Sequence, residues 1–161
     1  MKQISLHVYQ SIDGCPAPSD KHFDAAVDAS SCVLIDEETY LRIYMNHLGW
    51  PITAKETLVV TNGGIALTEN ERVKFIQGDA VAELRQMKED GDGMVVAYGE
   101  EIGALLLDNG LADEITVTTV PVLIGGGEKA LECGLNDGRA WIVRSNKVLV
   151  DGKMRTVYGK V

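Results

Sequence analysis

Residues 94–127 read MVVAYGEEIGALLLDNGLADEITVTTVPVLIGGG, and this stretch decides the fold. It starts as a short apolar strand, which is followed by a glycine turn at Gly99 and by a helix with apolar residues at helical spacing from Ile102 onward. Gly110 ends the helix, and a strand rich in Val, Ile and Thr follows over residues 114–124. Strand, glycine turn, helix and strand form a β-α-β unit, whose parallel strands predict a sheet covered on both faces.

The composition predicts one globular domain. The chain has 161 residues, of which 45% are hydrophobic and 24% charged, and this length is ample for a single core. We therefore expect residues 1–161 to form one domain. The formal net charge of −9 argues against binding to nucleic acid or to an anionic membrane surface, because both would repel the protein.

Targeting and redox features of the sequence favour a cytoplasmic protein. No apolar run approaches the roughly 20 residues of a membrane-spanning helix, and the first ten residues lack the apolar core of a signal peptide. The three cysteines, Cys15, Cys32 and Cys133, are far apart in the sequence and form neither a metal-binding pattern nor a disulfide framework. We expect reduced thiols, a cytoplasmic setting and no metal site.

A set of glycines, apolar residues and acids in the central stretch supports a more specific assignment. The set comprises Gly99, Leu106, Leu107, Gly110, Leu111, Asp113, Glu114, Pro121, Val122 and Gly125–Gly127. With Ser11-Ile12-Asp13-Gly14 after the first strand, it resembles the C-terminal reductase domain of the bacterial bifunctional riboflavin deaminase-reductases, a family that shares its fold with dihydrofolate reductase.

The resemblance implies a fold and an activity. The fold is a three-layer α/β/α arrangement around a mixed, mostly parallel sheet. A turn at Asp151-Gly152 between two strand-like segments predicts that this sheet ends in an antiparallel hairpin. The implied activity is NAD(P)H-dependent reduction of a pyrimidine- or pteridine-like molecule, most like 5-amino-6-(5-phosphoribosylamino)uracil reductase of riboflavin biosynthesis. The resemblance also implies a homodimer formed through the C-terminal strands.

Two carboxylates are candidates for contact with the substrate. Asp13 lies in the Ser-x-Asp-Gly loop after the first strand, and the resemblance implies that it orients or protonates the substrate. Asp20 stands at an expected helix start, about where dihydrofolate reductases place their substrate-binding acid. Each also has a structural explanation, since Asp-Gly is a common turn pair and Asp is a common helix N-cap.

The turn after the second strand is the first place where the chain departs from these relatives. They carry a glycine and then a basic or small residue, which face the dinucleotide; here the residues are Asp36 and Glu37, followed by Thr39 as a further candidate contact. Acids in a first helical turn stabilise the helix, but they would also repel a phosphate. Like charges about 4 Å apart cost roughly 4 kcal/mol at an effective dielectric constant near 20.

The next strand ends in Thr61-Asn62, which the resemblance places near the adenosine half of the cofactor. Their side chains can donate hydrogen bonds to that group. A plain turn explains the same residues, because Asn62 is followed by two glycines.

A second departure occurs in the central stretch. Relatives carry two or three glycines where this chain has Ala97-Tyr98-Gly99, and Glu100 and Glu101 follow at the start of the helix. A phosphate needs open backbone N–H groups at such a helix start. The resemblance makes these five residues candidates for cofactor binding, whereas their chemistry opposes a diphosphate.

Two functions therefore remain open. The first is an NAD(P)H-dependent reductase with NADPH or NADH as cofactor and a small molecule as substrate. The second is a diverged, non-catalytic protein that binds a small ligand on the same fold and has lost the dinucleotide, since fold alone does not fix function.

Overall fold

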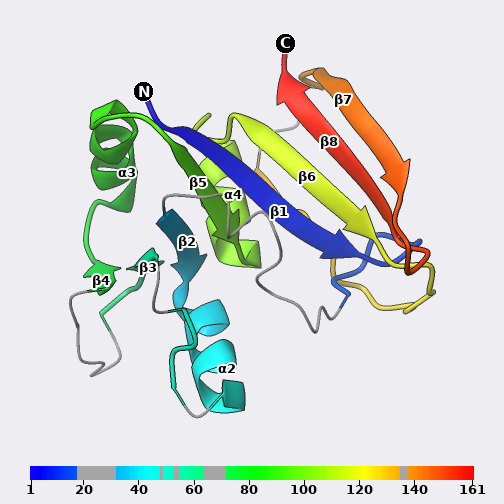
Figure 1. Cartoon of the computed structure of the whole chain (residues 1–161), viewed down its shortest axis with the longest axis horizontal. Helices are drawn as coiled ribbons and strands as arrows, with labels where there is room; N and C mark the ends of the chain where they lie inside the picture. Colours follow the sequence, from blue (N-terminus) through cyan, green and yellow to red (C-terminus); the bar gives the residue numbers. More distant parts are fainter. Residues whose placement is uncertain (18–31, 48, 53–54, 64–71, 135–137) are drawn as a thin grey trace.

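The computed structural model describes residues 1–17, 32–47, 49–52, 55–63, 72–134 and 138–161. In these residues eight strands form one mixed sheet in the order β4-β3-β2-β5-β1-β6-β8-β7, accompanied by three helices (Figure 1). The strands are β1 (Gln3–Gln10), β2 (Cys32–Asp36), β3 (Glu56–Val60), β4 (Val73–Ile76), β5 (Met94–Tyr98), β6 (Glu114–Thr119), β7 (Trp141–Val148) and β8 (Met154–Lys160). The helices are α2 (Glu37–His47), α3 (Ala80–Glu89) and α4 (Glu100–Asp108).

Six neighbouring strands, from β4 to β6, run parallel. Strand β1 lies between β5 and β6, with Leu6 opposite both Ala97 and Ile115. The predicted β-α-β unit therefore exists, with α4 carrying the chain across β1. The carboxyl ends of all six strands meet at one edge of the sheet, where ligands of such folds bind.

The last two strands add the expected antiparallel hairpin. Strand β8 pairs antiparallel with both β6 and β7. Across the turn, the Leu149 N–H donates to the Lys153 carbonyl at 2.7 Å, and Gly152 has a φ of +88° that suits glycine. The mixed, mostly parallel sheet with a C-terminal hairpin is thus confirmed.

Apolar residues cover both faces of the sheet. On one face, the alternate β1 residues Ile4, Leu6 and Val8 share a core with Leu84 of α3 and Ile102 of α4. On the other face, Val33, Ile35, Val59 and Val96 pack with Tyr40 of α2. Helices α3 and α4 therefore belong to one outer layer and α2 to the other, as the three-layer prediction requires.

The strand predicted over residues 114–124 is shorter than expected, because β6 ends at Thr119. Pro121 lacks an N–H group for the sheet, and the Val122 N–H donates to the Val120 carbonyl at 2.8 Å in a tight turn. The chain therefore leaves the sheet before residues 122–124.

Gly110 ends α4 as predicted. It has a φ of +65°, and the next residue, Leu111, is buried and donates its N–H to the Leu106 carbonyl at 2.9 Å. Among the described residues no helix combines the length and the apolar character that crossing a membrane requires. The cytoplasmic setting stays a prediction.

Candidate functional site

A cleft lies at the carboxyl ends of β1, β2 and β5, where α2 and α4 begin. Its polar lining consists of His7, Tyr9, Asp36, Glu38, Thr39, Arg42, Tyr98 and Glu100. We call it the strand-end cleft. Six of the residues that the sequence singled out as cofactor contacts gather at or next to it: Asp36, Thr39, Tyr98, Gly99, Glu100 and Glu101.

Asp36 holds the starts of two helices together. It is the last residue of β2 and only 3% exposed. Its Oδ1 accepts the Thr39 N–H at 2.9 Å in the first turn of α2. Its Oδ2 accepts the N–H groups of Glu101 and Ile102, at 3.2 and 3.3 Å, in the first turn of α4. One carboxylate thus satisfies N–H groups of two helix starts, which explains why an acid is stable here.

The field inside the strand-end cleft is negative. Partial burial raises the pKa of the Glu100 carboxyl above its ordinary value, and nearby carboxylates raise it further, namely Glu128, Glu38, Asp36 and Glu132. Crowded acids raise each other's pKa because each negative charge disfavours the next. Arg42 is the basic side chain in the lining among the described residues.

A second hollow lies on the other side of Asp36. It is lined by Asp36, Glu37, Val60, Asn62, Glu101, Ile102 and Leu105, and we call it the outer hollow. Asn62 therefore lies close to the start of α4, and its contact with the adenosine half of a cofactor stays a prediction. Within the described part of the chain, Glu37 Oε1 is buried without a hydrogen-bond partner.

Thr61 and Ala97 make contacts within the protein that belong to a turn and to the hydrophobic core. Thr61 Oγ1 accepts the Gly63 N–H at 3.2 Å, which is the turn contact that the sequence offered as the alternative. Ala97 is fully buried in the core that contains Leu6 and Ile102. Contacts of either residue with a cofactor stay predictions.

His7 and Arg42 belong to the strand-end cleft although the sequence did not single them out for it. The His7 and Tyr98 rings lie 5.3 Å apart, because the β1–β5 register places the two residues side by side. Two signals in the sequence could have found them. His7 alternates with the core residues of its strand, and Arg42 follows Thr39 by three residues on one helix face.

Asp13, the expected catalytic residue, lies outside the residues that line the strand-end cleft. Its carboxylate accepts hydrogen bonds from Ser11 Oγ at 2.5 Å and from the N–H groups of Ile124 and Gly125 at 3.2 and 2.7 Å. These bonds, that from Ser11 first, hold the Asp13 pKa well below its ordinary value. The observed contacts fasten one loop to another, and a catalytic role stays a prediction. The alternative acid, Asp20, and its expected helix lie outside the described residues.

The diphosphate of a nicotinamide dinucleotide does not fit these residues. The N–H groups that would bind it at the start of α4 already donate to Asp36. Glu38, Glu100 and Asp36 add negative charge around the same point. Both acidic departures noted in the sequence therefore meet at one place in the structure.

Several solved structures share this fold. A candidate riboflavin biosynthesis protein from Shewanella sp. PV-4 has a TM-score of 0.82 at 19% identity, with 99% of each chain covered. Dihydrofolate reductase from Enterococcus faecalis, complexed with NADP(H), has a TM-score of 0.70 at 13% identity, covering 98% of this chain and 95% of that one. The Thermotoga maritima diaminohydroxyphosphoribosylaminopyrimidine deaminase/5-amino-6-(5-phosphoribosylamino)uracil reductase has a TM-score of 0.69 at 14% identity. The alignment covers 99% of this chain but only 56% of that longer protein.

Sequence comparison gives the family. No curated protein sequence matches the chain. The RibD C-terminal domain family matches residues 33–153, which run from the second residue of β2 to the turn before β8 and include both acidic helix starts. The chain belongs to the RibD C-terminal domain family.

Proposed function

We propose that this protein binds a pyrimidine- or pteridine-like ring in the strand-end cleft. The observation that carries the proposal is the acidic lining, in which Glu38 and Glu100 occur beside the buried Asp36 and with one basic side chain, Arg42, among the described residues. Amino and ring N–H groups of such molecules donate to carboxylates, and these charge-assisted hydrogen bonds are strong. The rings of His7 and Tyr98, which line the same cleft, are flat groups against which a ring can stack.

Reduction of the bound ring is the use that family membership favours. The T. maritima relative is named as a reductase of a uracil derivative, and the E. faecalis relative is a dihydrofolate reductase with NADP(H). Riboflavin-biosynthesis-like reduction with NADPH or NADH is therefore one candidate activity. Thr39 and Asp13, which match the family's motifs, support it.

Binding without reduction is the use that the contacts of Asp36 favour. The carboxylate takes the backbone donors that a dinucleotide would need. A protein of this fold can keep its ring-binding cleft after losing the cofactor. The second candidate is accordingly a non-catalytic ligand-binding protein.

Ring binding is tested by thermal shift with two matched probes, diaminopyrimidine and the anionic pyrimidine orotate. The amino-substituted ring should raise the melting temperature and orotate should not, because the acidic lining repels the carboxylate of orotate even though its ring N–H groups are donors. A ligand at a hundredfold excess over its Kd stabilises by about 2.7 kcal/mol. Glu38→Gln should weaken the diaminopyrimidine shift, whereas Glu89→Gln, at the exposed end of α3, should leave it unchanged. Equal shifts with both rings would refute the proposal.

Reduction is tested separately by following NADPH absorbance. Dihydrofolate and 5-amino-6-(5-phosphoribosylamino)uracil serve as trial substrates. Consumption of NADPH that depends on one of them and on intact protein would establish the reductase candidate. Ring binding without any consumption would establish the second.

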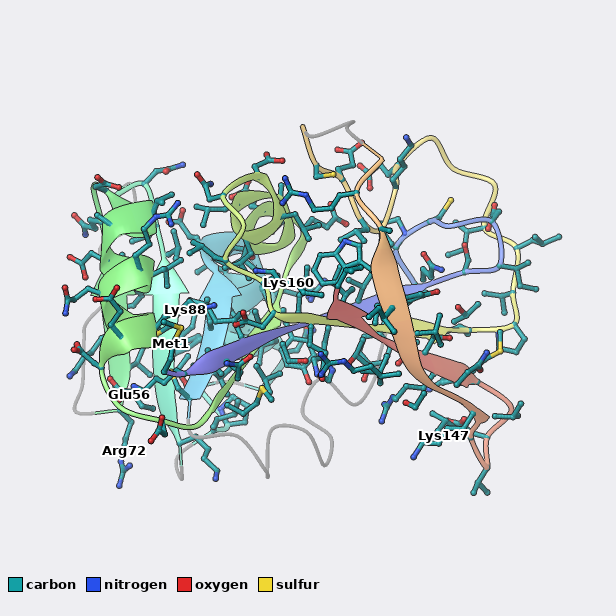
Figure 2. The ribbon with its side chains drawn as sticks, turned by 90° about the horizontal axis from the view of Figure 1, so that it is seen from above. Met1, Glu56, Arg72, Lys88, Lys147 and Lys160 are labelled. Atoms are coloured by element: carbon teal, nitrogen blue, oxygen red, sulfur yellow. The ribbon has the colours of Figure 1, made fainter. Side chains whose placement is uncertain are left out.

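We also propose a homodimer formed through β7. Among the described residues this strand pairs with β8 alone, and Ile142, Val143 and Val148 are 49%, 58% and 74% exposed. Figure 2 shows the hairpin projecting from the body of the sheet, with Lys147 near its tip. An unprotected apolar edge strand favours pairing with another chain.

Light scattering should show a dimer, and the substitution Val143→Lys should dissociate it. Lys74→Glu on β4, at the opposite edge of the sheet, should leave the dimer intact. A monomeric unmodified protein would contradict the proposal.

A further inference from the structure

The starts of α2 and α4 face a common point, and that point is already filled. Three N–H groups, those of Thr39, Glu101 and Ile102, converge on the two oxygens of Asp36. Converging N–H groups at helix starts are an anion site. Here the anion is supplied by the chain itself, as Asp36, which is only 3% exposed.

Space around the carboxylate excludes a second anion beside it. A β-carbon placed on Gly99 would lie 2.6 Å from Asp36 Cγ and 2.8 Å from Thr39 Oγ1. The carboxylate therefore packs directly against the backbone of Gly99, at the glycine turn where a diphosphate would approach. A phosphate that bound at this point of the glycine turn would have to displace the Asp36 carboxylate.

Asp36 also separates two hollows. It lines both the strand-end cleft and the outer hollow, which share no other lining residue among those described. A dinucleotide has two nucleoside halves joined by a diphosphate. A diphosphate that joined two nucleosides in these hollows would have to pass the position that Asp36 occupies.

We infer that Asp36 is an internal replacement for the diphosphate of a dinucleotide. It joins α2 to α4 in the folded protein without a ligand and prevents NADPH or NADH from spanning the two hollows. The ring ligand proposed above binds within the strand-end cleft alone. Its binding and this exclusion are therefore separately measurable, and the exclusion favours the non-catalytic candidate over the reductase.

The first experiment is titration of the unmodified protein with NADPH, NADH and inorganic pyrophosphate, by calorimetry and thermal shift. Up to millimolar concentrations, no binding is expected. Saturable binding of either dinucleotide with a micromolar Kd would overturn the inference. This result does not depend on whether any variant folds.

The second experiment is replacement of the internal anion by an added one. In Asp36→Gly the three N–H groups lose their acceptor, so the melting temperature should fall, and pyrophosphate should restore part of the loss. The same variant should bind NADPH at least tenfold more tightly than the unmodified protein. Asp79→Gly is the matched control, because Asp79 caps one helix, α3, by accepting the Ala82 N–H at an exposed position.

Each outcome of the second experiment decides the inference. Recovery of stability by pyrophosphate in Asp36→Gly, but not in Asp79→Gly, supports it, as does folding of Asp36→Gly only when the anion is present. A folded Asp36→Gly that gains neither pyrophosphate nor NADPH binding overturns it. If that variant stays unfolded in every buffer, the titration of the unmodified protein decides alone.

Discussion

Gly99 and Asp36 are in direct contact, because the backbone of Gly99 leaves no room for a β-carbon beside the Asp36 carboxylate. Gly99 also has φ +124° and ψ 149°, a conformation that other residues rarely adopt. We predict that Gly99→Ala lowers the free energy of unfolding by about 2–4 kcal/mol, from backbone strain and overpacking together. Urea denaturation measures it.

Gly110→Ala is the control for the backbone contribution, since Gly110 has φ +65° but open space around it. It should cost only about 1 kcal/mol. The cost of Gly99→Ala should fall by at least about 1 kcal/mol in an Asp36→Gly background, because the overlap with the carboxylate is then gone and only that with Thr39 Oγ1 remains. An unchanged cost in that background would mean that the contact with Asp36 is not the cause.

Lys88 and Asp113 form a second buried relationship, between α3 and the start of β6. Lys88 Nζ lies 2.5 Å from Asp113 Oδ2 and 3.1 Å from the Leu111 carbonyl, and the Ile4 N–H donates to the same carboxylate oxygen. Figure 2 labels the two lysines, Lys88 and Lys160, that approach Asp113. Asp113 therefore connects a helix with β1 and β8.

We predict that Asp113→Ala costs about 3–5 kcal/mol, because it leaves Lys88 buried without its partner. Lys88→Met should cost less, since Lys160 Nζ remains 3.8 Å from Asp113 Oδ1. Denaturant midpoints at low and high salt provide the measurement. Sensitivity of either cost to salt would show that solvent reaches the pair, contrary to the 8% exposure of Lys88.

The sequence predicted the parallel part of the sheet because the signals for its strands and helices are local. Strand β5, the turn at Gly99 and the end of α4 at Gly110 follow from apolar spacing and glycine alone. The two acidic helix starts were also visible. Their meeting on Asp36 was not, because it depends on β2 lying next to β5, with Ile35 opposite Tyr98. Such neighbours are 63 positions apart in the sequence, and no local pattern gives their distance.

The prediction for Asp13 was also limited by contacts between residues that are far apart in the sequence. Its loop was recognised, but its partners, the N–H groups of Ile124 and Gly125, come from more than 100 positions away. Because β6 ends early, at Thr119, residues 122–125 lie outside the sheet and contact the loop that contains Asp13. A motif thus located the acid without revealing what it contacts.

Asp13 gives a prediction for acid stability. Hydrogen bonds from Ser11, Gly125 and Ile124 lower the Asp13 pKa in the folded state, so its charged form stabilises the fold at pH values above the ordinary 3.8. That contribution is lost as the pH falls below this value toward the lower pKa of the folded state. The melting temperature of the unmodified protein should therefore drop more steeply in acid than that of Asp13→Asn. Parallel curves for the two proteins would show that these hydrogen bonds do not favour the charged form.

Glu100 should behave in the opposite way, because burial and surrounding carboxylates raise its pKa in the folded state. A raised pKa means that the folded protein favours protonated Glu100. The contribution of Glu100 to the free energy of unfolding is therefore greatest below the ordinary pKa of 4.5, and it declines as the pH rises through the folded-state pKa. We predict that Glu100→Gln raises the melting temperature at pH 7 by about 1–3 °C. The advantage should vanish near pH 4 and shrink with added salt.

Glu83→Gln, in the first turn of α3, is the matched control. It should give no gain in melting temperature, because Glu83 interacts favourably with the helix dipole and is not surrounded by other carboxylates. Glu100→Gln that destabilises as much as this control would show that the field at the start of α4 is not repulsive.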